Sequence, residues 1–143
     1  MLSIIVALTR EKERYFMKFI RWILGKIIIS LDLITRSTPV KRDIATQEEI
    51  NAISKQFSLY QFSACPFCVK VRRYLHHKAL YIELRDAKNN LEHKQTLIEE
   101  GGRHKVPCLR IEQKNSQVTW LYESNDIIAY LDEQLRSAHQ DRL

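Results

Sequence analysis

The sequence has only three cysteines in 143 residues, too few for the disulfide network of a small secreted scaffold. Two of them form a Cys-x-x-Cys pair, but no second such pair and no spaced pair of histidines follows. A structural zinc site normally needs four ligands of this kind. The adjacent His76 and His77 would point about 100° apart on a helix, which suits solvent better than one shared metal. We therefore expect no bound metal.

A general positive charge is also lacking, although the isoelectric point is 9.3. Residues 1–42 hold nine Lys or Arg and three acidic side chains, whereas the rest of the chain holds fourteen of each. The positive excess is therefore confined to the N-terminal segment. Neither an RNA-binding aromatic signature nor a zinc finger occurs, so we expect no nucleic-acid partner.

No small-residue cleavage site follows the apolar run at residues 15–34, which argues against a cleaved signal peptide. At 100° per residue, this run predicts a helix with two unlike faces. The apolar face has Phe16, Ile20, Ile23, Leu24, Ile27, Leu31 and Ile34, and the opposite face has Lys18, Arg21, Gly25, Lys26 and Asp32.

Such a basic amphipathic helix is typical of segments that lie in a bilayer interface, with cations toward anionic headgroups. A spanning helix is a second interpretation, because twenty residues reach about 30 Å, although Lys26 and Asp32 would then enter the hydrocarbon. Packing on the protein itself or on a partner is a third. We expect residues 1–42 to form this helix and a linker, and residues 43–143 to form one folded domain.

The most informative feature that is present is the Cys-Pro-Phe-Cys motif at residues 65–68. The apolar and aromatic residues 59–62 before it predict a strand, and the helical spacing of apolar residues at 69–75 predicts a helix. Pro66 just inside the helix then places Cys65 at its N-terminus. Free backbone N–H groups at this end favour an anion, in this case a thiolate.

Lowering a cysteine pKa from ~8.5 to ~5 takes roughly 5 kcal/mol, of which a helix dipole supplies at most about 2. Hydrogen bonds from the Cys68 thiol and nearby N–H groups, or the cation of Lys70, would have to supply the rest. We predict that Cys65 is the attacking nucleophile and that Cys68, one turn further on and less exposed, resolves the mixed disulfide. A structural disulfide and half of a zinc site are the interpretations left open.

The remaining pattern predicts a small α/β domain. A capping box, in which Glu49 follows Thr46 by three residues, predicts a short helix before the first strand. Ser124 is expected to cap the last helix. Further strands are predicted at 80–84, 106–112 and 118–122, and a further helix at 90–100. The order βαβαββα implies two parallel strands, then an antiparallel hairpin, in a four-stranded mixed sheet with helices on both faces.

This order and three motifs resemble the glutaredoxin family, which has the thioredoxin fold, over about residues 57–136. The motif at 65–68 is similar to the Cys-Pro-Tyr-Cys centre of that family. Val106-Pro107 resembles a Val-Pro whose proline is cis and lies against the active site. Residues 122–127 resemble the start of the last helix.

The pair Glu123-Ser124 within this stretch is also similar to the N-terminal domain of glutathione transferases. The resemblance implies a glutathione-dependent thiol-disulfide oxidoreductase that reduces protein disulfides or glutathione mixed disulfides. Cys65 and Cys68 would form its redox-active disulfide, with glutathione as co-substrate and no bound cofactor. The glutathione-binding residues implied by the resemblance are Phe67, Lys105, Val106, Pro107, Glu123, Ser124 and Asn125.

The sequence departs from the family at three places, one of which is Lys105, which stands where threonine is common. Members of the family often have a lysine shortly before the first cysteine, whereas residues 62–64 contain none. Tyr122-Glu123 stands in place of the family's Gly-Gly pair before the last helix. An iron-sulfur carrier of the same fold is an alternative that Pro66 disfavours. A non-catalytic glutathione-binding module is another, which the retained second cysteine disfavours.

Three further expectations follow. Cys108 is either a third redox thiol or a buried residue on a strand. The basic residues at 72–78 are expected to form a solvated helix face. Reduction by glutathione belongs in a reducing compartment, so we expect a cytoplasmic protein, attached to the cytoplasmic face of a membrane if residues 15–34 bind one.

Overall fold

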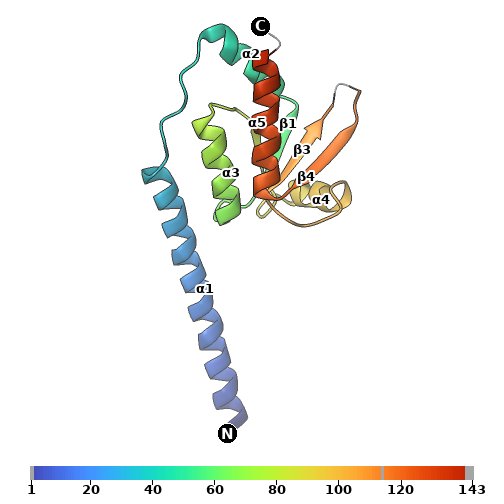
Figure 1. Cartoon of the computed structure of the whole chain (residues 1–143). Helices are drawn as coiled ribbons and strands as arrows, with labels where there is room; N and C mark the ends of the chain where they lie inside the picture. Colours follow the sequence, from blue (N-terminus) through green and yellow to red (C-terminus); the bar gives the residue numbers. More distant parts are fainter. Residues whose placement is uncertain (1, 114, 141–143) are drawn as a thin grey trace.

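The computed structural model describes residues 2–113 and 115–140, with side chains described for 14–113 and 115–138. A long N-terminal helix projects from a domain formed by the rest of the chain (Figure 1). The helices are α1 (Leu2–Ile34), α2 (Ile44–Ser54), α3 (Pro66–His77), α4 (Leu91–Glu99) and α5 (Ser124–Gln140). The strands are β1 (Phe57–Gln61), β2 (Glu83–Asp86), β3 (Cys108–Glu112) and β4 (Val118–Tyr122).

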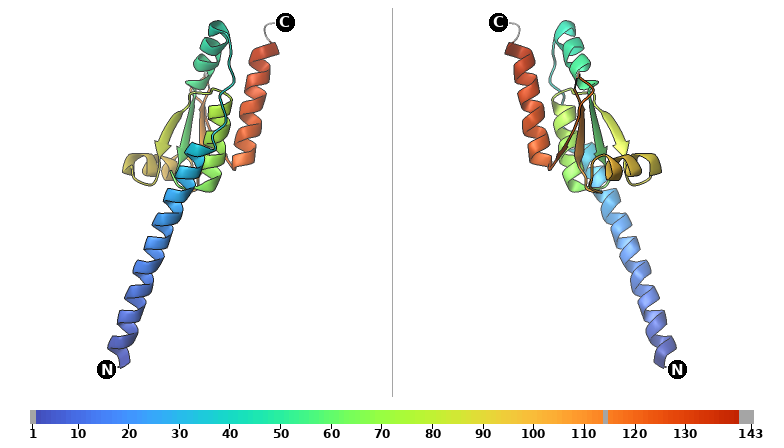
Figure 2. Two further views of the ribbon diagram at one scale, coloured as in Figure 1. Left: turned by 90° about the vertical axis from the view of Figure 1, so that its left-hand side faces the viewer. Right: turned by 90° about the vertical axis from the view of Figure 1, so that its right-hand side faces the viewer.

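The four strands form one mixed sheet in the order β2-β1-β3-β4. β1 pairs with β2 in parallel, whereas β1 with β3 and β3 with β4 are antiparallel. Helices α3 and α5 cover one face of the sheet and α4 covers the other (Figure 2). The predicted thioredoxin-like fold, with its βαβαββα order and helices on both faces, is confirmed.

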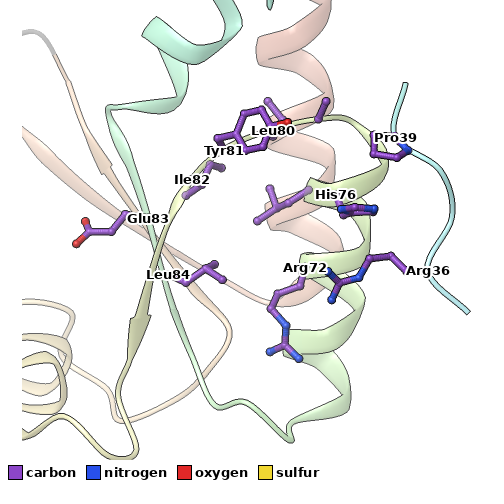
Figure 3. A pocket seen from close by; sticks show the side chains of 11 residues that line it. Arg36, Pro39, Arg72, His76, Leu80, Tyr81, Ile82, Glu83 and Leu84 are labelled. Atoms are coloured by element: carbon purple, nitrogen blue, oxygen red, sulfur yellow. The ribbon is translucent and has the colours of Figure 1, made fainter. Parts of the chain in front are cut away.

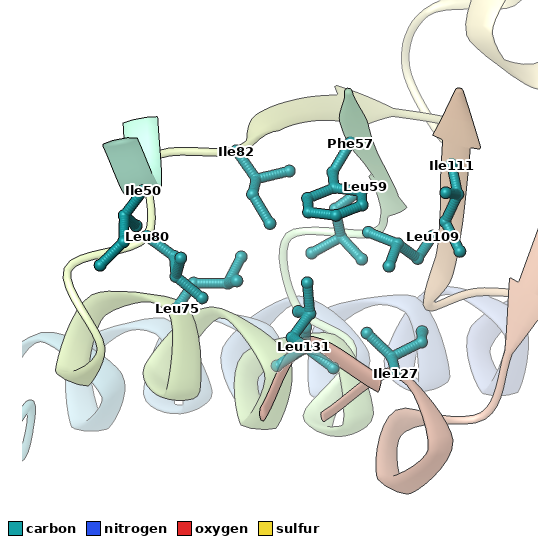
Figure 4. Close-up of a cluster of buried hydrophobic side chains, with 11 residues drawn as sticks. Ile50, Phe57, Leu59, Leu75, Leu80, Ile82, Leu109, Ile111, Ile127 and Leu131 are labelled. Atoms are coloured by element: carbon teal, nitrogen blue, oxygen red, sulfur yellow. The ribbon is translucent and has the colours of Figure 1, made fainter. Parts of the chain in front are cut away.

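Side chains alternate along β1 between the two faces of the sheet. Phe57 and Leu59 point toward α3 and α5 and belong to the larger core cluster, whereas Tyr60 belongs to a smaller cluster under α4. The larger cluster is shown in Figure 4 and comprises Ile50, Phe57, Leu59, Val71, Leu75, Leu80, Ile82, Leu109, Ile111, Ile127 and Leu131. The smaller one comprises Tyr60, Ala87, Leu97 and Cys108.

The strand register brings four connecting segments to one edge of the sheet. Cys108 pairs with Tyr60 on one side and with Tyr122 on the other, while Gln61 pairs with Asp86. β1, β2 and β4 therefore end where β3 begins. The segments that meet at this edge are residues 62–65, 87–90, 105–107 and 123–125.

Two predicted helix starts are wrong, by three residues in α2 and by one in α5. Helix α2 begins at Ile44, because the carboxylate of Asp43 accepts a hydrogen bond from the Thr46 N–H at 2.9 Å and caps the helix ahead of the predicted box. Ser124 is the first residue of α5 and not its cap. The Glu123 carbonyl accepts the first helical bond, from the Ile127 N–H at 3.0 Å, and Glu123 has a φ of +66°.

Two strands also begin later than predicted. Leu80 and Ile82 are buried but precede β2, because the Leu80 N–H bonds to the Leu75 carbonyl at 2.9 Å and closes the end of α3. Their apolar side chains therefore reflect core packing and not strand pairing. β3 begins at Cys108, after a Val106-Pro107 peptide bond that is cis, as the resemblance implied.

Helix α1 is longer than the predicted 15–34, and the segment from 36 to 43 that follows it has no regular secondary structure, as expected of a linker. Within the described residues, no helix combines the length and the apolar character needed to cross a membrane.

Candidate functional site

Cys65 lies where the motif predicts, at the N-cap of α3. Its N–H closes the turn at 63–64 by bonding to the Phe62 carbonyl at 3.2 Å, and its own carbonyl accepts the first helical bond, from Val69, at 2.9 Å. Pro66 occupies the first turn, where its missing N–H costs nothing. The Cys65 side chain is half-buried and its thiol is free. The Cys65 side chain makes no capping hydrogen bond, so the first N–H groups of α3 are not paired with it, and an N-terminal position of this kind favours a thiolate.

Cys68, one turn further along α3, is completely buried and also a free thiol. Burial, helped by a hydrogen bond with Cys65, raises the pKa of Cys68 to about 12, although the Phe62 backbone and Arg72 act to lower it. Cys68 therefore keeps its proton at neutral pH and can donate it to the Cys65 sulfur. The two thiols are thus unlike in access and in ionisation.

The loop before Cys65 is held by Arg72, which sequence reasoning had assigned to a solvated face. That assignment is wrong: the Arg72 side chain is 13% exposed. Its guanidinium donates to the Ser63 carbonyl at 2.8 Å and to the side-chain oxygen of Gln61. Arginine has several donors in a rigid fork, which lets one side chain tie the end of β1 to the loop. Only the folded position of α3 against this loop reveals the role.

The loop at 105–107 meets the start of α5 through an ion pair. Lys105 and Glu123, both exposed and both expected to bind glutathione, contact each other directly. Pro107 is buried and Val106 is half-buried. Within residues 2–113 and 115–140, neither the Val106 N–H nor its carbonyl has a hydrogen-bond partner. This backbone is therefore available to an extended peptide.

The start of α5 also contacts α3. The ammonium of Lys70 donates to the side chain of Asn125. Lys70 was one candidate for stabilising the Cys65 sulfur, and this contact holds its ammonium at α5 instead. Ser124 is buried and Asn125 is exposed, and both directly follow Glu123, which pairs with Lys105. Phe67, which follows Pro66, is 63% exposed.

A pocket of about 570 Å³ opens beside Cys65. Apart from Cys65, it includes none of the predicted site residues. It is lined by Phe62, Ser63, Ala64, Cys65, Ala87, Lys88, Asn89, Lys94 and His104. Lys88 and Lys94 thus bring positive charge to the side of Cys65 where residues 62–64 carry none. Sequence reasoning missed both lysines, although the parallel pairing of the first two strands would have placed the loop after the second strand beside the first.

The loop that carries Lys88 has a defined shape. The Asp86 carboxylate accepts hydrogen bonds from the N–H groups of Lys88 and Asn89, at 2.8 and 3.1 Å. Although partial burial acts to raise it, these bonds and that of the Asn89 side chain hold the pKa of Asp86 below its ordinary value. On the other side of the pocket, the His104 ring lies against Phe62 and its Nε2 is 3.4 Å from the Ala87 carbonyl.

A second pocket, of about 530 Å³, lies between the linker, α3 and the segment that leads into β2 (Figure 3). Arg36, Arg72 and His76 line its linker and α3 side, and residues 79–84 line the other. It includes no thiol, so it is separate from the redox motif.

Cys108 is completely buried on β3. Burial raises the pKa of Cys108 to about 12, in spite of a hydrogen bond with Tyr122 that acts to lower it. The Tyr122 hydroxyl donates to the Gly101 carbonyl at 2.7 Å, which joins the end of α4 to the end of β4. Of the two interpretations of Cys108, burial on a strand agrees with the structure.

A comparison with family models agrees with the predicted likeness to glutathione transferases. A model of the glutathione S-transferase N-terminal domain matches residues 59–138, close to the span of 57–136 on which the resemblance was based. A crystal structure of oxidized glutaredoxin 2 from Chlamydomonas reinhardtii is 22% identical, with a TM-score of 0.44, and the match covers 68% of this chain and 92% of that one. No curated protein matches the sequence.

Proposed function

Because this chain belongs to the glutathione S-transferase N-terminal domain family, we propose that it is a glutathione-dependent thiol-disulfide oxidoreductase. The observation that carries the proposal is the pairing of two unlike thiols at the start of α3. Cys65 is accessible at the helix N-terminus, whereas Cys68 is buried and keeps its proton. An attacking thiol needs access and thiolate character, and a resolving thiol needs neither until the mixed disulfide has formed.

The reaction proceeds by two thiol-disulfide exchanges. The Cys65 thiolate attacks the glutathione sulfur of a protein–glutathione disulfide, which forms a Cys65–glutathione disulfide while the protein thiolate leaves and takes up a proton. A second glutathione thiolate then attacks the glutathione sulfur of this intermediate. Oxidised glutathione leaves, and Cys65 returns as a thiolate. For a protein disulfide substrate, the Cys65 thiolate attacks one sulfur and forms a mixed disulfide, while the other substrate sulfur leaves as a thiolate and takes up a proton. Cys68 then gives up its proton and attacks the Cys65 sulfur, which releases the reduced substrate and leaves a Cys65–Cys68 disulfide. Two glutathione molecules reduce this disulfide to two thiols, and oxidised glutathione leaves.

Glutathione binds across the edge of the sheet where the four segments meet. The free N–H and carbonyl of Val106 pair with the cysteinyl backbone of glutathione, beside the buried Pro107. The first N–H groups of α5, at Ser124 and Asn125, donate hydrogen bonds to the γ-glutamyl carboxylate.

Charged and apolar side chains complete this site. Glu123 binds the γ-glutamyl ammonium, which requires it to share or leave its contact with Lys105. The exposed ring of Phe67 borders the site next to Cys65. Lys88 and Lys94, in the pocket beside Cys65, bind the glycyl carboxylate in place of the missing lysine before the motif. The substrates are disulfide-containing proteins, and a cytoplasmic location suits this direction of electron flow.

Activity assays of three single variants test the proposal. Cys65→Ser should abolish glutathione-coupled reduction of both a small glutathione mixed disulfide and a protein disulfide. Cys68→Ser should retain the first activity and lose the second, because only a protein disulfide needs the resolving thiol. Cys108→Ala is the matched control and should retain both. Retained activity in Cys65→Ser would refute the catalytic role and leave a non-catalytic glutathione-binding module.

A further inference from the structure

Helix α1 docks on the domain through the polar side that sequence analysis had set apart from its apolar face. A Cβ on Gly25 would lie only 3.3 Å from the Cβ of Ala64, the residue before Cys65. Two turns further on, Asp32 is 4% exposed and its carboxylate lies 2.8 Å from Arg36 Nη2 and 3.4 Å from Arg73 Nε. Gly25 and Asp32 are seven residues apart and share one side of the helix. This side faces α3 and the loop at residues 62–65, which we call the redox loop.

The apolar face of α1 is consequently left uncovered. Ile27, Leu31 and Ile34 are 47%, 53% and 79% exposed, and Phe16 is 63% exposed. A helix that packs on its own domain normally buries its apolar face and exposes its polar one. Here Gly25 and Asp32 lie toward the domain together with the half-buried Ile28 and Ile29, whereas most of the apolar face is exposed. The N-terminal part of the helix extends clear of the domain in every view (Figures 1 and 2).

The remaining side chains of α1 combine cations with aromatic rings. Lys26 lies 5.8 Å from the centre of the Trp22 ring and Lys18 lies 5.8 Å from that of Tyr15. Phe19 stacks on Trp22 at 6.3 Å. All three rings are more than half exposed. Aromatic side chains beside lysines are the composition of helices that lie at the boundary between water and lipid.

We propose that α1 binds the surface of a bilayer that contains anionic lipids, with its apolar face in the lipid and the domain on its aqueous side. The positions of the side chains around the helix agree with this orientation. At 100° per residue, Lys18 and Arg21 lie within about 40° of Gly25, on the side that faces the domain. Ile27 and Ile34 lie about 160° to 180° away from Gly25, on the side that would face the lipid. The cations therefore reach the headgroups when the apolar face is down. A spanning orientation is incompatible with this docking, because the Gly25–Ala64 contact and the buried Asp32 hold the C-terminal third of α1 against the domain.

This orientation, which extends the proposed function, also defines a substrate class. Gly25 meets the residue next to Cys65, so the reactive thiol lies roughly one helix diameter, about 10 Å, above the lipid. We infer that the substrates are glutathione mixed disulfides and protein disulfides at the membrane surface.

Vesicle co-sedimentation of the full chain tests the binding surface without any redox chemistry. Wild type should sediment with vesicles of phosphatidylcholine and phosphatidylglycerol in equal parts, and less with phosphatidylcholine alone. Ile27→Glu/Ile34→Glu should weaken binding to the anionic vesicles by at least about tenfold. The matched control Tyr81→Glu/Leu91→Glu places the same charges at side chains that are 71% and 68% exposed outside α1, and should bind as wild type.

Equal binding by both double variants, or no binding by wild type, would overturn the proposal. A dimer of the wild type in solution that Ile27→Glu/Ile34→Glu dissociates would also overturn it, since a second copy would then cover the face. Cys65→Ser should bind vesicles as wild type does, so loss of activity and loss of membrane binding are separate results. For the substrate class, a glutathionylated peptide anchored on vesicles should be reduced faster than the same peptide in solution by wild type, but not by Ile27→Glu/Ile34→Glu. Equal rates of reduction of the anchored and the free peptide by wild type would contradict the proposed substrate class.

Discussion

Alkylation of the reduced protein at neutral pH should modify one thiol of the three. Iodoacetamide reacts with thiolates, so its rate at each cysteine follows the thiolate population and the access to the sulfur. Cys65 is the accessible thiol, whereas Cys68 and Cys108 are completely buried. We expect complete labelling of Cys65 before the other two react measurably.

The size of the expected difference in labelling rate follows from the pKa values of the two buried thiols. Burial raises the pKa of Cys68 and that of Cys108 from 9.0 to about 12. Each thus has about a thousandfold less thiolate at neutral pH than an ordinary cysteine. The Cys65→Ser variant should therefore label at least about a thousandfold more slowly than wild type, with burial of the sulfur adding to the difference.

Mass spectrometry of tryptic peptides measures the rate at each position. Cys108 falls in its own peptide, between Lys105 and Arg110, and fragmentation separates Cys65 from Cys68. Labelling in denaturant provides the control, in which all three thiols should react alike. Labelling of Cys68 at a rate equal to that of Cys65 in the folded protein would refute the assignment of attacking and resolving thiols.

Three further predictions concern stability and are tested by urea unfolding of the reduced protein. The raised pKa values of Cys68 and Cys108 let the unfolded chain ionise first, so the contribution of these two thiols to the free energy of unfolding should be constant below about pH 9. It should then fall by about 1.4 kcal/mol per thiol for each pH unit up to about 12, and a flat profile above pH 9 would contradict their burial. Arg72→Met should destabilise by roughly 1–3 kcal/mol, through loss of its bonds to the redox loop, whereas Arg136→Met, at a side chain 71% exposed, should change little; equal effects would contradict the role of Arg72. Gly101→Ala should destabilise by roughly 1–3 kcal/mol, because its Cβ would lie 2.6 Å from a backbone carbonyl oxygen, and an unchanged midpoint would contradict that close approach.

Local signals were sufficient for much of the fold and for the redox motif. The position of Cys65 depends on a strand, a turn and a helix start within a few residues, and each has its own sequence signature. The hairpin of β3 and β4 is local in the same way. Leu80 and Ile82 were misassigned to a strand because burial alone does not distinguish a strand from a packed connection.

The parts that were missed depend on contacts between distant segments. Arg72 reaches a loop nine residues before it, and Lys94 reaches the Cys65 pocket only because β2 pairs beside β1. The reversed docking of α1 depends on Asp32 finding arginines of the linker and of α3. The amphipathic pattern identified the two faces of the helix but not which of them meets the domain.

The most direct test of the central claim is to locate glutathione after reaction with the Cys68→Ser variant. Incubation with oxidised glutathione should leave one glutathione per chain, and peptide mass spectrometry should find it on Cys65. The Cys65→Ser variant should carry none under the same conditions. Glutathione on Cys108, or no adduct on Cys65 after complete exchange, would contradict the proposal that this thiol attacks glutathione disulfides at the start of α3.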